Sequence, residues 1–138
     1  MAYIYPQKVL FKHCDPAGIV FYPRYFEMMN DCVEAFFDAV LGLPFSAVHK
    51  KGGVPTAEIA TRFTAPSRLG DDLVIRLDVA KLGRSSIGLR FQAECRSEVR
   101  FRADSTLVLV NETGRPTAWP EPVREKINQC LKEDNNDS

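Results

Sequence analysis

The chain has 138 residues, which is the length of one ordinary domain. Hydrophobic residues make up 45% of it and charged residues 26%, with 18 acidic side chains against 18 basic ones. This composition is typical of a folded globular protein, and the balanced charge gives no electrostatic reason to expect nucleic acid or a membrane as a partner. The sequence also shows no membrane-spanning apolar run and no signal-peptide pattern, so we expect a cytoplasmic protein.

The cysteines indicate neither disulfides nor a metal centre. Cys14, Cys32, Cys95 and Cys130 are widely spaced, and the chain has only two histidines. Because no C-x-x-C pair is present, neither a disulfide framework nor a zinc cluster is suggested. We expect four reduced thiols and no metal or other cofactor.

The first predicted elements are a strand and a long helix. Residues 3–12 (YIYPQKVLFK) read as a strand. Apolar residues between Tyr22 and Val40 then recur at the spacing of one helix face, which predicts one long amphipathic helix. Pro23 suits the first turn of this helix, where a missing N–H costs nothing, and the sequence GLP ends it.

After a Gly-Gly turn at 52–53, the pattern alternates with period two, as strands do. The predicted strands are residues 54–66, 72–82, 86–98 and 99–112. The boundary between the last two is uncertain, since no Gly or Pro marks it. A short helix over 121–131 completes a single domain spanning 1–131, and the polar tail 132–138 is expected to fray.

One long helix and five strands predict an α+β fold in which the helix covers one face of an antiparallel sheet. Polar residues such as Arg76, Asp78, Arg90 and Gln92 alternate onto the other face, so that face can meet water. An edge strand of such a sheet is equally able to pair with a second copy of the chain.

The segment HCDPAGIVFYPRYF places a single acid, Asp15, in a turn just before the helix. The Asp-Pro step and Gly18 reverse the chain, so the carboxylate comes close to the helix N-terminus. There the N–H groups of Tyr22, Arg24 and Tyr25 are expected to lack intrahelical partners. These donors could polarise a carbonyl that the carboxylate attacks, or toward which it activates water. The same residues also make an ordinary turn, which is the commoner role for an acid there.

Three other residues could carry chemistry but are assigned structural roles. His13 ends an alternating strand and is expected to face solvent. Cys14 has no basic neighbour in sequence to activate it, so we expect a packed thiol. Glu58 alternates with apolar residues in its strand and is expected to be structural.

The residues CDPAGIVFYPRYF resemble the active-site segment of the hotdog-fold acyl-CoA thioesterases, in particular the 4-hydroxybenzoyl-CoA thioesterase family. The order β, α, then four β agrees with that family over nearly the whole chain. The resemblance implies a five-stranded antiparallel sheet wrapped around one long central helix. It also implies that Asp15 is the nucleophile or general base against the thioester carbonyl, and that the Tyr22 backbone N–H polarises this carbonyl.

The resemblance further implies an assembly and a substrate path. Family members pair their sheets edge to edge in dimers, often within a tetramer built as a dimer of dimers, and their active sites lie at the subunit interface. Coenzyme A phosphates meet basic and hydroxyl residues near a later turn, which matches Arg84, Ser85 and Ser86 here. Gly18 and Tyr25, inside the matching segment, are expected to border the substrate.

Asn30 bears on the acyl group. It lies in the apolar stripe of the helix, four residues from Phe26 and three from Val33, where an amide needs a partner. Recognition of the acyl group or a bound water is one role for it, and a bond to backbone or an interface partner is the other. An amide matches a phenolic hydroxyl less well than a carboxylate. We therefore expect an aromatic acyl-CoA of benzoyl or hydroxybenzoyl type, or a short-chain acyl-CoA, as substrate.

Two rival functions stay open. A hotdog hydratase or dehydratase needs a histidine paired with a carboxylate, and neither His13 nor His49 has such a setting in sequence. A non-catalytic acyl-CoA-binding hotdog protein would keep the pocket and lose turnover.

Overall fold

The computed structural model describes residues 2–48, 50 and 52–136. Its largest element is one antiparallel sheet. Its five strands are hydrogen-bonded in the order β1-β4-β5-β6-β3, and every pairing is antiparallel. The strands are β1 Tyr3–Lys8, β3 Thr56–Phe63, β4 Asp72–Leu82, β5 Ser86–Cys95 and β6 Glu98–Val108. The predicted antiparallel α+β arrangement is confirmed, although β1 ends earlier than expected.

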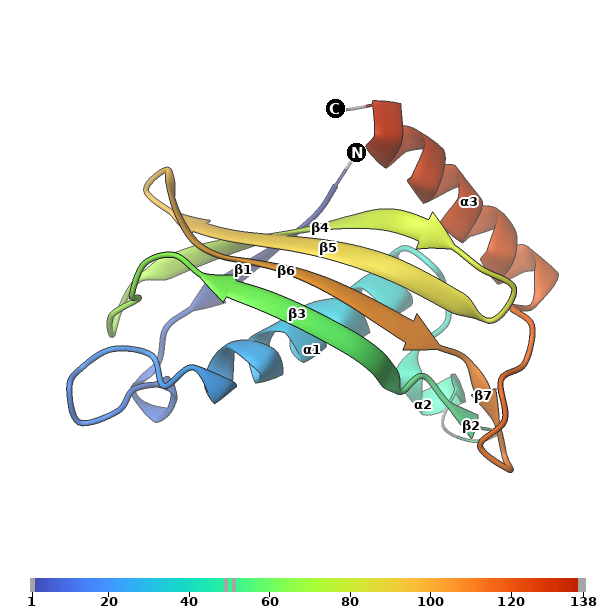
Figure 1. Cartoon of the computed structure of the whole chain (residues 1–138), viewed down its shortest axis with the longest axis horizontal. Helices are drawn as coiled ribbons and strands as arrows, with labels where there is room; N and C mark the ends of the chain where they lie inside the picture. The colour runs from blue at the N-terminus through green and yellow to red at the C-terminus, as the bar shows by residue number, and fades with distance from the viewer. Residues whose placement is uncertain (1, 49, 51, 137–138) are drawn as a thin grey trace.

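The helix α1, Pro23–Ala39, lies along one face of this sheet (Figure 1). Its buried side chains are Tyr25, Met28, Met29, Cys32, Val33, Phe36 and Phe37. They share one core with strand residues such as Ile75, Phe91 and Phe101, which are at most 1% exposed. Each large apolar side chain buried there contributes about 1.5–3 kcal/mol relative to exposure in water. The helical periodicity therefore predicted the face of α1 that holds the fold together.

A second, two-stranded sheet lies beyond one end of the first. It pairs β2, Gly52–Gly53, with β7, Val110–Asn111, and the short helix α2, Phe45–Val48, lies nearby. The glycines expected to form a turn therefore form a short strand. A Cβ on Gly52 would collide with the Val110 carbonyl, so this close backbone approach requires glycine.

The turn between β5 and β6 explains the uncertain boundary in the sequence. Arg96 and Ser97 both have positive φ, at 52° and 68°. Two consecutive positive φ angles are typical of a type I′ hairpin turn, which usually carries Asn or Gly. Since neither usual residue is present, the sequence contains no local mark for this turn.

The C-terminal helix α3, Glu121–Asn136, continues past Leu131 into the segment that was expected to fray. β1 covers the edge of β4 only as far as the pairing of Tyr3 with Leu77. Beyond that point, Asp134 Oδ2 accepts the Val79 N–H at 2.7 Å, so α3 lies along the part of β4 that β1 leaves uncovered (Figure 1). None of the described helices is both long and apolar enough to cross a membrane.

Candidate functional site

The candidate site begins at a tight turn ahead of α1. After β1, a 3-10 helix, η1 Phe11–His13, leads the chain to Asp15. The Asp15 N–H donates to Ile19 O and the Gly18 N–H donates to Asp15 O, both at 2.9 Å. Gly18 has a φ of +80°, which glycine adopts without steric cost. The backbone of this turn therefore holds Asp15 in place, and Gly18 serves the turn through its conformation.

The two carboxylate oxygens of Asp15 are used unequally. Oδ1 accepts the Ala17 N–H at 2.9 Å, which orients the half-buried side chain. Oδ2 has no hydrogen-bond partner among the residues that the structure describes. One oxygen thus fixes the carboxylate, and the other is available to act on a substrate or a water molecule.

The N-terminus of α1 offers one unused backbone donor. The Arg24 N–H donates to Phe21 O at 2.8 Å and the Tyr25 N–H donates to Tyr22 O at 3.1 Å. The expectation that both groups are free is therefore wrong, because the first turn tightens into i to i−3 bonds. The Tyr22 N–H has no acceptor within the described part of the chain. A single donor, supported by the helix dipole, is left for an oxyanion.

An apolar hollow of about 360 Å³ adjoins this donor. It is lined in part by Ile19, Tyr22, Tyr25 and Phe63. Tyr25 is 4% exposed and its ring packs against Phe63 and Phe101, with centroids 5.7 and 4.9 Å away. Tyr25 thus supports the floor of the hollow from the core. Tyr22 is 58% exposed, so the first turn of α1 presents an aromatic side chain to solvent.

A second cavity, of about 270 Å³, lies farther along α1, between the helix and the sheet. Its lining is mostly apolar and includes Phe26 and Phe91, and none of the residues lining it is charged. The polar side chains at this cavity are Asn30, Thr56 and Ser105. Asn30 borders the cavity but is exposed, because it lies at the margin of the buried helix face and not within it. This cavity suits an uncharged acyl group.

The predicted phosphate contacts lie far from Asp15 within one chain. Arg84 and Ser85 lie in the turn between β4 and β5 and Ser86 begins β5, at the other end of the sheet (Figure 1). The 11 residues of β4 separate the two ends, and at about 3.3 Å per residue they span roughly 35 Å. The turn is held by its backbone, since Ser85 O accepts the Leu109 N–H at 2.7 Å.

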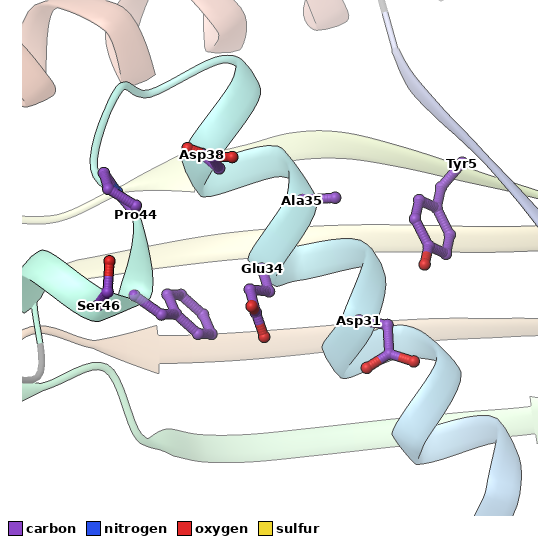
Figure 2. Close-up of a pocket in the computed structure, with 8 residues that line it drawn as sticks. Tyr5, Asp31, Glu34, Ala35, Asp38, Pro44 and Ser46 are labelled. Carbon is purple, nitrogen blue, oxygen red and sulfur yellow. The ribbon is translucent and has the colours of Figure 1, made fainter.

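A larger hollow, of about 470 Å³, lies on the solvent side of α1. Figure 2 shows Asp31, Glu34 and Asp38 projecting from the helix there, with Tyr5 on the neighbouring strand. All three carboxylates are exposed. Like charges repel, so this acidic surface disfavours the phosphates of coenzyme A. The smaller cavities along α1 and β3 are the better candidates despite their size.

His13 is buried, so the expectation that it faces solvent is wrong. It is 5% exposed, and its Nδ1 accepts the Leu10 N–H at 2.9 Å. β1 ends at Lys8, so the alternation of a strand does not reach His13 and η1 turns the ring inward. Burial lowers the pKa of His13, and the neighbouring Lys12 lowers it further. Sequence reasoning missed this residue because it continued the strand too far.

We expect the free energy of unfolding to fall as the pH drops below about 6.5, the ordinary histidine pKa. Because the pKa of His13 is lowered in the folded state, the unfolded chain binds the proton more readily. The stabilising contribution is therefore complete above about pH 6.5 and is lost as the pH falls through the folded pKa. Protonation also removes the acceptor of the Leu10 N–H, a bond worth about 1 kcal/mol.

Urea unfolding between about pH 5 and 8 measures this effect. The matched variant is His13→Asn, whose amide oxygen can accept the Leu10 N–H without titrating in this range. Its stability should depend less on pH than that of the wild type. Equal slopes for the two proteins would contradict the assignment to His13.

The structure also places the remaining candidate residues, Cys14 and Glu58. Cys14 Sγ donates to Leu10 O at 3.6 Å, and all four cysteines are free. Glu58 is exposed on β3, and its backbone carbonyl accepts from Ser105. His49 lies outside the described residues.

Comparison with known proteins identifies related chains. The model of a family described as Thioesterase-like superfamily matches residues 9–127. No curated protein matches the sequence. Among solved structures, a gentisyl-coenzyme A thioesterase is 29% identical, with 91% of this chain and 99% of that chain covered and a TM-score of 0.83.

Two further solved structures have the same fold at lower identity. A 1,4-dihydroxy-2-naphthoyl-CoA thioesterase from Synechocystis is 17% identical, with 93% of this chain and 96% of that chain covered and a TM-score of 0.85. A hypothetical protein from Staphylococcus aureus, solved in complex with CoA, is 18% identical, with 96% and 85% covered and a TM-score of 0.88. At these identities the likeness establishes the fold alone.

Proposed function

This chain belongs to the Thioesterase-like superfamily, and we propose that it hydrolyses an acyl-CoA thioester to the free acid and coenzyme A. Among the described residues, one oxygen of the Asp15 carboxylate and the Tyr22 N–H at the start of α1 have no hydrogen-bond partner, and the turn that holds Asp15 leads directly to Tyr22. A carbonyl that accepts the Tyr22 N–H would therefore lie close to the short segment that carries Asp15.

In the proposed mechanism, the thioester carbonyl oxygen accepts the Tyr22 N–H, which makes the carbonyl carbon more electrophilic. Asp15 then acts in one of two ways. It attacks the carbon itself, releases the thiolate of coenzyme A and leaves a mixed anhydride that water hydrolyses. Alternatively, it takes a proton from a water molecule that attacks the carbon. In both cases the negative charge on the carbonyl oxygen is stabilised by the same backbone donor and the helix dipole.

The proposed acyl group is aromatic, of benzoyl or hydroxybenzoyl type, or a short chain. The uncharged, mostly apolar lining of the cavity beside Phe26 and Phe91 supports this. Asn30, Thr56 and Ser105 supply amide and hydroxyl groups that can hydrogen-bond a ring hydroxyl. The gentisyl-coenzyme A thioesterase, at 29% identity, adds support for a hydroxylated aromatic acid.

We propose that the enzyme works as a dimer, or as a tetramer of two dimers, joined through β3. Among the described residues this strand pairs only with β6, and it is exposed along almost its whole length. Ile59 and Phe63 are 39% and 43% exposed on it, and the Phe63 ring lies beside the exposed ring of Tyr22. An open strand edge flanked by apolar side chains is a ready template for a second copy.

An antiparallel two-fold pairing of β3 edges would also complete the site. The Phe63 end of β3 touches Tyr22, with ring centroids 5.9 Å apart. The opposite end lies near the β4–β5 turn, since residues 108 and 109 donate to the carbonyls of Pro55 and Ser85. Reversing one strand against the other would bring the partner's β4–β5 turn, with its predicted phosphate contacts, to the same end as the catalytic turn.

Thiol release from a panel of benzoyl-, hydroxybenzoyl-, phenylacetyl- and short aliphatic acyl-CoAs tests the proposal. We expect the benzoyl types to be hydrolysed fastest. Asn30→Leu should lower kcat/KM for hydroxybenzoyl-CoA about five- to tenfold more than for benzoyl-CoA, because only the former loses a hydrogen bond. Specific activity should fall on dilution if the site needs a second subunit.

The same panel, extended by an enoyl-CoA, separates the rival functions. A wild type that binds an acyl-CoA and releases no thiol would support a non-catalytic binding protein. Addition of water to an enoyl-CoA without thiol release would support a hydratase. Either result would overturn the proposed hydrolysis.

A further inference from the structure

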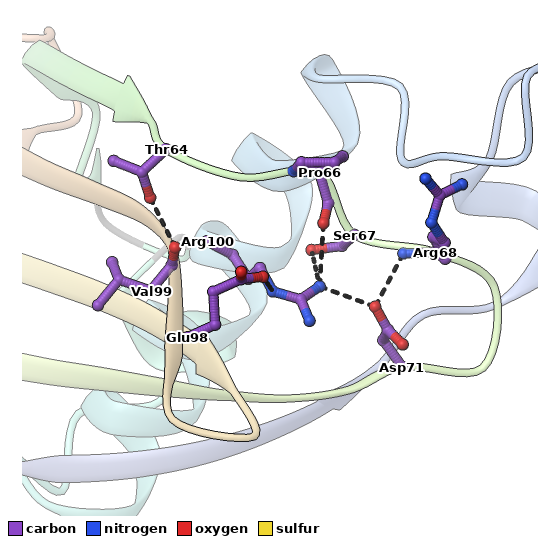
Figure 3. A network of polar contacts seen from close by, with 8 residues as sticks. All are labelled: Thr64, Pro66, Ser67, Arg68, Asp71, Glu98, Val99 and Arg100. Carbon is purple, nitrogen blue, oxygen red and sulfur yellow. Dashed lines mark hydrogen bonds and ion pairs between the residues drawn. The ribbon is translucent and has the colours of Figure 1, made fainter.

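A buried arginine outside the candidate site organises a polar network beneath it. Arg100, on β6, is 8% exposed (Figure 3). Its Nη1 donates to Pro66 O at 3.1 Å, to Ser67 Oγ at 3.2 Å and to Asp71 Oδ2 at 2.7 Å. All three acceptors belong to residues 66–71, the later part of the segment that joins β3 to β4. One guanidinium group therefore holds an irregular segment together.

The Asp71 and Arg100 side chains each make one further polar contact. Asp71 Oδ2 also accepts the Arg68 N–H at 2.9 Å, and these two contacts lower the pKa of Asp71. Glu98 Oε1 lies 2.9 Å from Arg100 Nε as an ion pair, without the alignment of a hydrogen bond. The side chains of Arg100 and Asp71 are only 10% and 17% exposed. Removing one partner of a pair this buried strongly destabilises the fold, because the other charge is left buried and uncompensated.

Residues 66–71 are themselves bonded to the turn that carries Asp15. The Val20 N–H donates to Ser67 O at 2.8 Å, and Ile19 forms an antiparallel bridge with Arg68. Ile19 O is the acceptor of the Asp15 N–H. A short series of contacts thus runs from the buried guanidinium, through residues 67 and 68, to the carboxylate-bearing turn.

The network also lies against the first turn of α1. The Tyr25 hydroxyl is buried without a hydrogen bond in the described residues, and Ser67 lies beside it. The Tyr25 ring packs against Phe101, the residue after Arg100. The network therefore contacts both the turn that carries the proposed catalytic carboxylate and the helix end that carries the proposed oxyanion donor.

Backbone hydrogen bonds attach only the first part of the β3–β4 connection to β6 among the described residues. Thr64 and Ala65 donate their N–H groups to Arg100 O, at 2.9 and 3.3 Å, so the chain leaving β3 is already attached to β6 by its backbone. The guanidinium acts one step farther on, at residues 66–71, where the hydrogen bonds to β6 among the described residues all come from this side chain.

We propose that Arg100 is a positioning residue for thioester hydrolysis, setting the Asp15 turn against the Tyr22 N–H through residues 66–71. This inference rests on the proposed roles of Asp15 and Tyr22. Proximity effects in catalysis are lost over displacements of about 1 Å, so a loosened support should lower turnover without changing any group that meets the substrate.

Three variants test the proposal. Arg100→Met keeps much of the side-chain volume and removes every donor. Arg100→Lys keeps the charge and places three N–H donors on one nitrogen, whereas Nη1 serves its three acceptors with two N–H groups. Asp134→Asn is the matched control, because it weakens a partly buried side-chain contact to Val79 at the opposite end of the sheet. All are assayed well below their unfolding temperatures.

We expect Arg100→Met to lower kcat for a benzoyl-type CoA about 100-fold, with KM changed less than about threefold. Arg100→Lys should recover about tenfold of this loss. Asp134→Asn should keep kcat within about twofold of the wild type. A kcat for Arg100→Met equal to that of the control would overturn the proposal.

Hydrogen exchange over residues 14–22 gives a readout that needs no turnover. The Asp15 and Val20 N–H groups are bonded in the network, so they should exchange about tenfold faster in Arg100→Met and unchanged in Asp134→Asn. Unchanged exchange in Arg100→Met, or an equal rise in the control, would overturn the proposal. If the wild type releases no thiol, the proposed function fails, while exchange still decides whether Arg100 holds the turn.

Discussion

Asp15→Asn is expected to lower kcat for acyl-CoA hydrolysis by about 10²- to 10⁴-fold while the protein stays folded. The amide can neither attack the thioester carbonyl nor take a proton from water. The turn should survive, because the amide oxygen can accept the Ala17 N–H in place of Asp15 Oδ1. Asp15→Ala would be a poorer test, since it also removes this hydrogen bond.

Thiol release and the unfolding temperature of the same preparations measure this prediction. The matched control is Asp72→Asn, which removes one acid from an exposed surface ion pair with Lys8. That variant should retain wild-type activity, since exposed pairs contribute little. Hydrolysis by Asp15→Asn at the wild-type rate would refute the role given to Asp15. In the wild type, a single turnover in oxygen-labelled water would label Asp15 only if an anhydride forms.

Tyr22→Pro is expected to lower kcat by about 10²- to 10³-fold, the effect of removing one oxyanion donor. Tyr22 has a φ of −52°, which lies within the range of proline, so the ring fits the existing backbone. The Tyr22 carbonyl still accepts the Tyr25 N–H in the variant. The substitution therefore removes the N–H and the side chain but keeps the hydrogen bonds of the first helical turn.

Tyr22→Ala is the matched control, because it removes the same ring and keeps the N–H. It should retain kcat within about tenfold of the wild type, with the main change in KM, since the ring is exposed beside the apolar hollow. If both variants lose turnover equally, the side chain and not the N–H is responsible. An ester in place of the Tyr22 peptide N–H provides a second test that leaves every side chain unchanged.

Periodicity was enough to predict the main elements, because it depends on neighbours in the chain. The 3.6-residue repeat predicted α1, and the two-residue repeat predicted the four strands from β3 to β6. The Asp15–Gly18 turn was also predictable, since both its hydrogen bonds and the φ of Gly18 are local. The type I′ turn at residues 96 and 97 was not, because its residues are unusual for that conformation.

Several site residues could not be placed from the sequence. His13 was assigned to the end of a strand, but β1 ends five residues before it and the side chain is buried. Asn30 was expected within the apolar stripe of α1, but it is exposed at the margin of that stripe. Three free donors were expected in the first turn of α1, but the Arg24 and Tyr25 N–H groups find local acceptors, and among the described residues only the Tyr22 N–H matches the expectation. Such outcomes depend on where each element ends, because a shift of one residue can turn a side chain from solvent into the core.

The antiparallel α+β fold and the acid that precedes the helix were predictable from the sequence, since both rest on patterns within a few residues. What surrounds that acid, and where α3 lies against β4, depends on tertiary contacts. Arg100 reaches Asp71, 29 residues away, and Asp134 reaches Val79, 55 residues away. Such pairs form only when the sheet brings distant segments together, and a repeat along the chain carries no information about which distant residues will meet.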